Sequence, residues 1–219
     1  MINAIITAAG KNRRMEEDQK NLGIELKNKL LLDLRGKPVI VQTLEHVQKT
    51  IVDQSIIVLG HFNDEIKTVL KNYKNKKVKI ISNTNHDVQL SKTLLNGVNN
   101  VEEGLCLCVA ADQPTVSTIS MNNLIECTLK QPEPENIVSV LARRETGYLN
   151  STEGLGMPFV CHSSLLNKYL PGKNDNLNPI LGDMLSDGVI FYGIKPRDEL
   201  ELTNINHWDD YLKVRKLFK

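Results

Sequence analysis

The sequence lacks the charge excess, the long apolar run and the leader pattern that mark several classes of protein. Its 27 lysines and arginines almost balance 26 aspartates and glutamates in 219 residues. Proteins that bind nucleic acid or a membrane surface need a strongly basic face, so the composition argues against both. No run approaches the ~18 apolar residues of a membrane span, and Met1 to Ile6 carries no basic segment of a signal peptide. We therefore expect a soluble, cytoplasmic globular chain.

Cysteine is scarce, and its spacing excludes common metal and redox sites. Cys106 and Cys108 stand two residues apart in an apolar run, so on a strand they share one face and cannot bridge each other without distortion. No C-x-x-C pair and no Cys/His cluster with zinc spacing occurs among the four cysteines. The pattern predicts reduced thiols in the core.

What the sequence does contain is an alternation of short isoleucine- and valine-rich runs with helical patterns. This alternation is typical of β-α-β units around a parallel sheet. We expect strands at 4–8, 55–59, 78–81, 105–111, 137–141, 157–161 and 189–194, and helices at 38–48, 63–70, around 94–98, and at 117–129, 163–169, 179–185 and 208–218. Since no repeat or long linker divides the chain, the pattern predicts a single α/β domain over 1–219.

Small residues follow the first expected strand directly. Ala8, Ala9 and Gly10 allow backbone N–H groups to approach an anion closely, and Arg13 and Arg14 come next with donors suited to phosphate oxygens. Ligands of open parallel sheets bind beyond the carboxyl ends of the strands, where this loop lies. The loop matches neither the P-loop nor the dinucleotide-binding pattern. Taken alone, it fits a phosphate cradle and a basic surface turn equally well.

Asp112 ends the most apolar run of the chain, and Pro114 stops the strand there. Alone, this aspartate is more simply a turn or helix-cap residue. Beside a loop that binds phosphates, however, a carboxylate is the hard oxygen ligand that Mg²⁺ takes together with phosphate oxygens. Lys29 is a compact positive charge for the same phosphates. The loop and Asp112 together favour a magnesium–phosphate site.

Five patterns occur in a fixed order along the chain. They are A-A-G-x-x-x-R-M with K-L-L-L at 8–15 and 29–32, N-x₆-L-S-K-T-L-L-N-G-V at 83–98, A-D-Q-P at 111–114, G-M-P at 156–158 and N-I-N at 204–206. Together they resemble the motifs of the MobA-like nucleotidyltransferases, and within that group those of the molybdenum cofactor cytidylyltransferases. The resemblance implies a Rossmann-like, three-layer nucleotidyltransferase fold with a mostly parallel central sheet.

The resemblance also implies a reaction and a set of site residues. The reaction is transfer of CMP from CTP (GTP in related enzymes) to the phosphate of molybdopterin with release of pyrophosphate, and a transient contact with molybdoenzyme chaperones is implied as well. Mapped onto this chain, Arg14, Lys29 and Asp112 are expected to be catalytic, and Asp112 and Asn206 to bind Mg²⁺. The residues expected to bind the nucleotide are Ala8, Ala9, Gly10, Asn12, Ser91, Thr93 and Gly97.

The chain departs from the family pattern at three places. Asn12 replaces a serine, although its amide can still donate a hydrogen bond. The residues from Glu16 to Asn28 form a longer insert than the family has, which we expect to be a mobile flap. Asn204 and Asn206 stand where cytidylyltransferases often have aspartate, a form more familiar from guanylyltransferases, whereas A-A-G and the glutamine of A-D-Q-P favour the cytidylyl side.

Three alternatives therefore remain beside cytidylyl transfer to molybdopterin. They are guanylyl transfer to the same cofactor, cytidylyl transfer to methylerythritol phosphate or choline phosphate, and nucleotide binding without turnover. The neutral Asn206 and the long insert motivate the last one. Since a phosphate acceptor is already an anion, none of the transfer reactions requires a general base.

Overall fold

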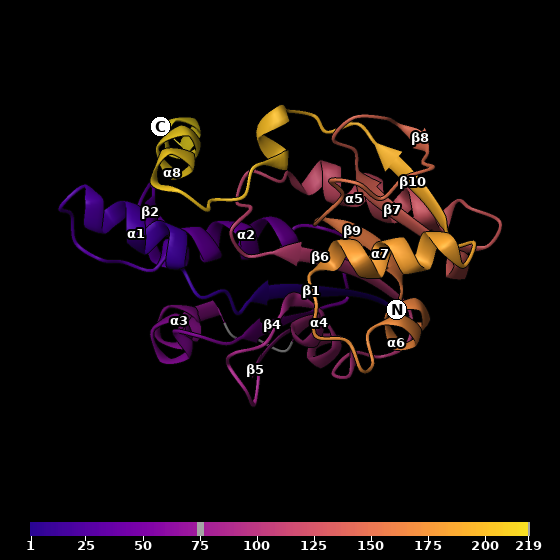
Figure 1. The fold of residues 1–219 in the computed structure, drawn as a ribbon, viewed down its shortest axis with the longest axis horizontal. Coiled ribbons are helices and arrows are strands. Elements are labelled where there is room, and N and C mark those ends of the chain that lie inside the picture. Colours follow the sequence, from indigo (N-terminus) through magenta and orange to yellow (C-terminus); the bar gives the residue numbers. More distant parts are fainter. Residues whose placement is uncertain (74–76, 219) are drawn as a thin grey trace.

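A central sheet with helices on both faces forms the architecture of the computed structural model, which describes residues 1–73 and 77–218 (Figure 1). The eight strands lie in the order β5-β4-β1-β6-β9-β7-β10-β8. In chain order they are β1 (Ile2–Ala8), β4 (Gln54–Leu59), β5 (Val78–Ser82), β6 (Leu105–Ala110), β7 (Ile137–Leu141), β8 (Gly147–Tyr148), β9 (Phe159–His162) and β10 (Ile190–Ile194). A small separate hairpin consists of β2 (Asp33–Leu34) and β3 (Lys37–Pro38). The expected three-layer fold is confirmed.

The sheet is mostly parallel. β1 pairs in parallel with β4 and β6, β4 with β5, and β7 with β10. β9 lies antiparallel between β6 and β7, and the short β8 closes the far edge antiparallel to β10. Since β6 and β7 both oppose β9, they run in the same direction. The carboxyl ends of all the parallel strands therefore meet at one edge of the sheet.

Two sets of helices cover the two faces. The buried side chains of α2 (Val39–Gln48), α3 (Asn63–Leu70), α5 (Thr118–Leu129) and α8 (Trp208–Arg215) join one apolar cluster, and those of α4 (Leu90–Val98), α6 (Ser163–Tyr169) and α7 (Leu177–Ser186) join the other. In β1, Ala4 and Ile6 enter the first cluster and Ile5 the second, because successive side chains point to opposite faces. Within the described residues, no helix is long and apolar enough to cross a bilayer.

The thiols of the central strands are free, as expected. Cys106 and Cys108 on β6 and Cys161 on β9 are fully buried, with Cys106 directly opposite Cys161. Burial raises the pKa of Cys106 to about 12 and moves the pKa of the other two thiols well upward. Because the thiolate is the reactive form, these cysteines behave as small apolar core residues.

The insert expected to be a mobile flap contains regular structure. Its first part belongs to α1 (Arg13–Asn21), which lies beside α8 at one end of the molecule (Figure 1). Asp18 on α1 accepts hydrogen bonds from the backbone N–H of Trp208 at 2.9 Å and from Nδ1 of His207 at 3.1 Å. The hydrogen bond from Trp208 holds the pKa of Asp18 below its usual value. These contacts tie the insert to the C-terminal helix.

Candidate active site

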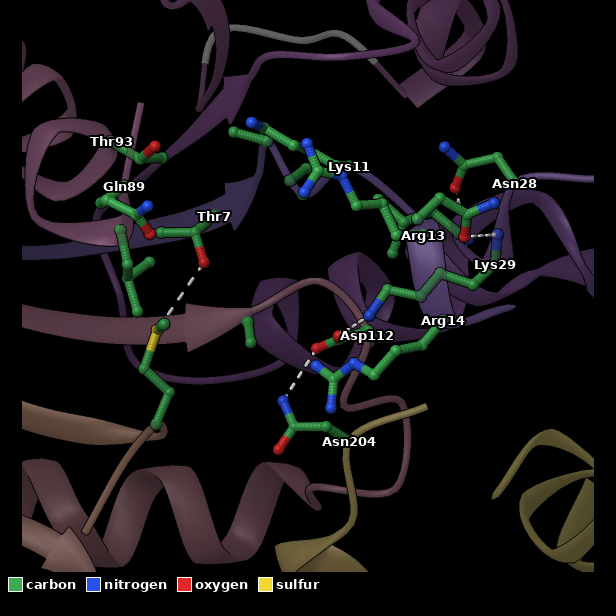
Figure 2. A pocket seen from close by; sticks show the side chains of 18 of the residues that line it. Thr7, Lys11, Arg13, Arg14, Asn28, Lys29, Gln89, Thr93, Asp112 and Asn204 are labelled. Carbon is green, nitrogen blue, oxygen red and sulfur yellow. Dashed lines mark hydrogen bonds and ion pairs between the residues drawn. The ribbon is translucent and has the colours of Figure 1, made fainter. Parts of the chain in front are cut away.

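A cavity of about 460 Å³ opens at the carboxyl ends of β1 and β6 (Figure 2). Parallel sheets of this kind bind their ligands at such a place. The sequence patterns at 8–15, 29–32, 111–114, 156–158 and 204–206 all contribute to its wall. The lining residues are Thr7, Ala8, Ala9, Gly10, Lys11, Asn12, Arg13, Arg14, Asn28, Lys29, Leu30, Val88, Gln89, Leu90, Thr93, Ala110, Asp112, Met157, Asn176 and Asn204.

The loop after β1 presents an open backbone to this cavity. A Cβ atom built on Gly10 would find no neighbouring heavy atom within 4 Å, so the space beside this glycine is free. Ala9, next to it, packs closely on Gly60, where an added Cβ would lie only 2.7 Å from the Cβ of Ala9. A fixed loop with free space at Gly10 lets a bulky anion approach the backbone closely.

Asn12 connects this loop to Lys29. It adopts the left-handed conformation (φ 61°) just before α1, which asparagine tolerates better than most residues. Its Oδ1 accepts from the backbone N–H of Lys29 at 3.0 Å, and its Nδ2 donates to Oε1 of Glu16 and the carbonyl of Lys27. The amide that we expected to meet the nucleotide is therefore engaged within the protein. Asn12 places Lys29 at the cavity despite the insert between them.

The three residues expected to be catalytic come together at one end of the cavity (Figure 2). Lys29 Nζ donates to Oδ2 of Asp112 and, at 3.0 Å, to Oδ1 of Asn206. Arg14 Nη2 donates to the same Asn206 oxygen at 3.1 Å, and Asn204 Nδ2 donates to Oδ1 of Asp112 at 2.9 Å. The side chains of Lys29 and Asp112 are only 14% and 13% exposed. This polar cluster joins the beginning, the middle and the end of the chain.

Positive charge predominates around the cluster. Lys11, Arg13, Arg14 and Lys29 all line the cavity. Lys11 also forms an ion pair with Asp87, which lies on the loop before α4. The hydrogen bond from Lys11 and its charge hold the pKa of Asp87 below its usual range. Four cations beside one cavity carboxylate suit a ligand with several negative charges, such as a triphosphate.

The other part of the cavity is uncharged and includes Met157, whose sulfur accepts a hydrogen bond from Thr7 Oγ1 at 3.7 Å. Figure 2 shows Thr93 and Gln89, from the α4 region, together with Thr7 of β1, apart from Lys29 and Asp112. Thr93 Oγ1 accepts a hydrogen bond from Nδ2 of Asn83 at 3.0 Å. Its hydroxyl proton is therefore available to donate to a ligand atom. This region suits an uncharged group such as a base or a sugar.

Two residues that we expected to bind the nucleotide do not line the cavity. Ser91 is fully buried, and its Oγ accepts from the backbone N–H of Asp175 at 2.9 Å. A Cβ built on Gly97 would lie 2.5 Å from Cγ2 of Ile5 and 3.3 Å from Cγ2 of Val58. In this structure the Ser91 hydroxyl connects α4 to the backbone at Asp175, and Gly97 lets α4 pack closely on the sheet, so their role in nucleotide binding stays a prediction.

Asn204 and Gln113 were not among the expected site residues. Asn204 lines the cavity and bonds Asp112, whereas Asn206 contacts Lys29 and Arg14. Gln113 is buried behind them, and its Nε2 donates to the carbonyl of Met157 at 2.8 Å and to Oδ1 of Asn204 at 3.3 Å. The N-I-N and A-D-Q-P patterns contained the signal for these residues. No sequence pattern marked Asn28, Gln89 or Asn176.

The donor set of the cluster can be tested against a divalent metal. Among the described residues, no group of three or more His, Cys, Asp and Glu side chains could hold a metal ion. The cluster instead offers one carboxylate, Asp112, with the amide oxygen of Asn206 nearby. This set fits Mg²⁺ that arrives with a nucleotide, since Mg²⁺ is usually bound by one or two carboxylates plus phosphate oxygens and keeps several waters.

Residues 4–177 match the MobA-like NTP transferase domain family, and the chain belongs to this family. It is 40% identical to a nucleotidyl transferase from Methanothermobacter thermautotrophicus, with a TM-score of 0.92 over 100% of this chain and 97% of that one. The 4-diphosphocytidyl-2C-methyl-D-erythritol synthase from Anaerococcus prevotii shares the fold at 15% identity, with a TM-score of 0.70 over 99% of this chain and 95% of that one.

Curated relatives include longer proteins. The bifunctional protein GlmU of Psychrobacter sp. (strain PRwf-1) is 24% identical over 94% of this chain and 49% of its own length. The chain thus spans about half or less of the curated relatives that it matches first.

Proposed function

We propose that the protein transfers CMP from CTP to a phosphorylated small molecule, with Mg²⁺, and releases pyrophosphate. The observation that carries this proposal is the meeting of Arg14, Lys29, Asp112 and Asn206 beside the open loop at Gly10. Nucleotidyl transfer depends on alignment and charge neutralisation rather than on a protein nucleophile. The cluster supplies both.

The cationic end of the cavity is the proposed place for the triphosphate. The free space at Gly10 admits its oxygens to the backbone, and Arg13 and Arg14 offer forked donors. Lys29 donates to Asp112 in the free protein. When the nucleotide binds, the Lys29 ammonium exchanges this partner for phosphate oxygens and leaves the Asp112 carboxylate available for the metal.

Mg²⁺ bound with the nucleotide would be held by Asp112, with Asn206 as a second oxygen ligand, and would neutralise charge on the phosphates. Arg14 and Lys29 add positive charge where the transferred and leaving phosphates carry negative charge. The acceptor phosphate attacks without losing a proton. No residue of this chain is therefore needed as a general base.

CTP is the proposed donor nucleotide, and molybdopterin the first acceptor. The support is the likeness of A-A-G at 8–10 and A-D-Q-P at 111–114 to molybdenum cofactor cytidylyltransferases. Thr93, whose hydroxyl proton can donate into the neutral region, can serve an acceptor atom on the base. Methylerythritol phosphate is the second candidate acceptor, because the synthase from Anaerococcus prevotii named for its cytidyl derivative shares the fold over 99% of this chain.

Pyrophosphate release tests the proposal. The purified protein is mixed with Mg²⁺, with CTP or GTP, and with molybdopterin, methylerythritol phosphate or choline phosphate. Turnover with CTP supports the proposal, and the acceptor that reacts identifies the pathway. Turnover with GTP alone would overturn the cytidylyl assignment, and tight CTP binding without turnover on any acceptor would favour a binding protein.

A matched pair of variants locates the reaction in the cavity. Lys29→Ala removes the cation beside Asp112, whereas Lys20→Ala removes an exposed lysine on α1 outside the cavity lining. We expect Lys29→Ala to lower the rate by about 10²-fold, the scale of losing one preorganised charge-stabilising group. Lys20→Ala should leave the rate unchanged.

A further inference from the structure

A buried carboxylate lies behind the segment that carries Asn204 and Asn206. Glu201 belongs to the 3₁₀ helix η4 (Glu199–Leu202) and is only 2% exposed. Burying a carboxylate is costly unless hydrogen bonds satisfy its oxygens. An acidic residue in such a position therefore calls for a structural or functional reason.

Both oxygens of Glu201 accept hydrogen bonds from two separate segments. Oε1 accepts from the backbone N–H of Ser117 at 2.9 Å, and Oε2 from the backbone N–H of Arg197 at 2.9 Å. The Ser120 hydroxyl lies 2.9 Å from Oε1 and 2.7 Å from Oε2. Ser117 is the N-cap of α5, so the carboxylate also lies at the positive end of that helix.

The arrangement needs two acceptor oxygens on this side chain. The donors on its two oxygens are backbone N–H groups, which cannot turn into acceptors. A glutamine amide has one oxygen and one NH₂ group, so it would direct an N–H donor at either Ser117 or Arg197. Only a carboxylate satisfies both sides at once.

Glu201 connects the two segments that form the proposed metal site. α5 follows the loop of Asp112 directly, whereas η4 leads straight into Asn204 and Asn206. The backbone N–H of Ile205 donates to the carbonyl of Asp112 at 2.9 Å. Fixing η4 against the start of α5 thus fixes the two asparagines against Asp112.

We propose that Glu201 is a positioning residue, which holds the Asn204–Asn206 segment against Asp112 by binding the N-terminus of α5. The inference rests on the proposed function for its catalytic consequence, because the segment contributes to the site only if the site transfers nucleotides. Its structural part, the attachment of 203–206, can be measured without any substrate.

The test compares Glu201→Gln with Glu199→Gln, a matched control on the same 3₁₀ helix whose side chain is exposed. Hydrogen–deuterium exchange of the free protein is measured at the backbone amides of 203–206, with Ile205 as the main reporter. We expect at least ~10-fold faster exchange there in Glu201→Gln, since local opening limits the exchange of bonded amides. Glu199→Gln should match the wild type.

The kinetic measurement separates positioning from general stability. In Glu201→Gln, kcat should fall about 10-fold, because a small misplacement of reacting groups is costly. The KM for the nucleotide should change by less than about 3-fold, since the hydrogen bonds of Glu201 go to Ser117, Ser120 and Arg197 and not to the loop around Gly10. A milder variant, Ser120→Ala, leaves both backbone donors in place and should shift exchange and kcat in the same direction by less. It also replaces Glu201→Gln if that variant does not fold.

The outcomes are distinct. Wild-type exchange at 203–206 in Glu201→Gln and Ser120→Ala, or equal acceleration in Glu199→Gln, overturns the positioning role. Accelerated exchange with an unchanged kcat overturns the catalytic consequence. If the wild type turns over no nucleotide with any acceptor, the proposed function fails, and the exchange data still decide whether Glu201 fixes the segment.

Discussion

Replacing Asp112 by asparagine tests the core of the site. An asparagine has one acceptor oxygen, whereas Asp112 accepts from Lys29 on one oxygen and from Asn204 on the other. Asp112→Asn therefore turns an NH₂ group toward one of these donors and removes the negative charge beside a lysine that is 14% exposed. Two distinct losses follow, one of rate and one of stability.

Both losses can be given a size. Losing one preorganised charge-stabilising group lowers the rate by about 10²-fold, which corresponds to ~2.7 kcal/mol of activation free energy. Removing the partner of a fully buried ion pair costs ~3–5 kcal/mol. Since the pair of Lys29 and Asp112 faces an open cavity, we expect a loss of about 1–2 kcal/mol in the free energy of unfolding.

Adding Lys29→Met to Asp112→Asn separates the two effects. The double variant no longer contains an unpaired ammonium, so its free energy of unfolding should recover most of the loss, while its rate stays low. Urea unfolding gives the stability, and pyrophosphate release at saturating Mg²⁺ gives the rate. A rate for Asp112→Asn within about 5-fold of the wild type would refute the role of this carboxylate, because one lost charge-stabilising group costs far more.

Three further predictions follow from single contacts. Asp87→Asn removes the ion-pair partner of Lys11 and so leaves Lys11 available for phosphates. Calorimetry should show that the nucleotide binds up to ~5-fold more tightly, which corresponds to the free energy of an exposed ion pair. Unchanged binding would place Lys11 outside the phosphate site. Gly10→Ala should weaken nucleotide binding at least ~10-fold without lowering stability, because the space beside Gly10 is free. Gly97→Ala would push a methyl group against Ile5 and should lower the free energy of unfolding by about 1–2 kcal/mol. A loss of stability in Gly10→Ala, or a stable Gly97→Ala, would contradict these roles. Burial lowers the pKa of His46 below 6.5, so the unfolded chain binds a proton on this side chain more readily than the folded chain does. The free energy of unfolding should therefore fall as the pH drops through 6.5. Urea titrations of His46→Gln should lack this part of the pH dependence.

The sequence predicted the fold well because its strands are short apolar runs with distinct boundaries. The run at 105–111 became β6, whose residues Leu105–Ala110 are all buried within the sheet. The patterns that end at the carboxyl edge also predicted which loops meet, since parallel strands bring those loops together. Arg14, Lys29 and Asp112 accordingly line one cavity.

The sequence could not predict contacts that depend on the exact path of the chain. Asn12 lines the cavity as expected of a nucleotide-binding residue, but the hydrogen bonds of its amide to Glu16 and Lys27 were not predicted. Gly97 lies within the pattern at 83–98, and only the folded chain shows its close packing on Ile5. Glu201 lies in an ordinary acidic stretch, and only the folded chain brings it to Ser117. The pairings of Gly97 with Ile5 and of Glu201 with Ser117 join residues far apart in sequence and leave no local pattern.

The hydrogen bond between Arg14 and Asn206 spans 192 positions of the chain. During synthesis on the ribosome, the first loop thus emerges long before its partner exists. A growing chain can form β1, β4 and β5 early, but the polar cluster at the cavity stays incomplete until the residues around Asn206 have emerged. Truncated translation products that end before this point would retain much of the sheet while lacking the asparagines and α8, and so would lack the complete polar cluster around Asp112.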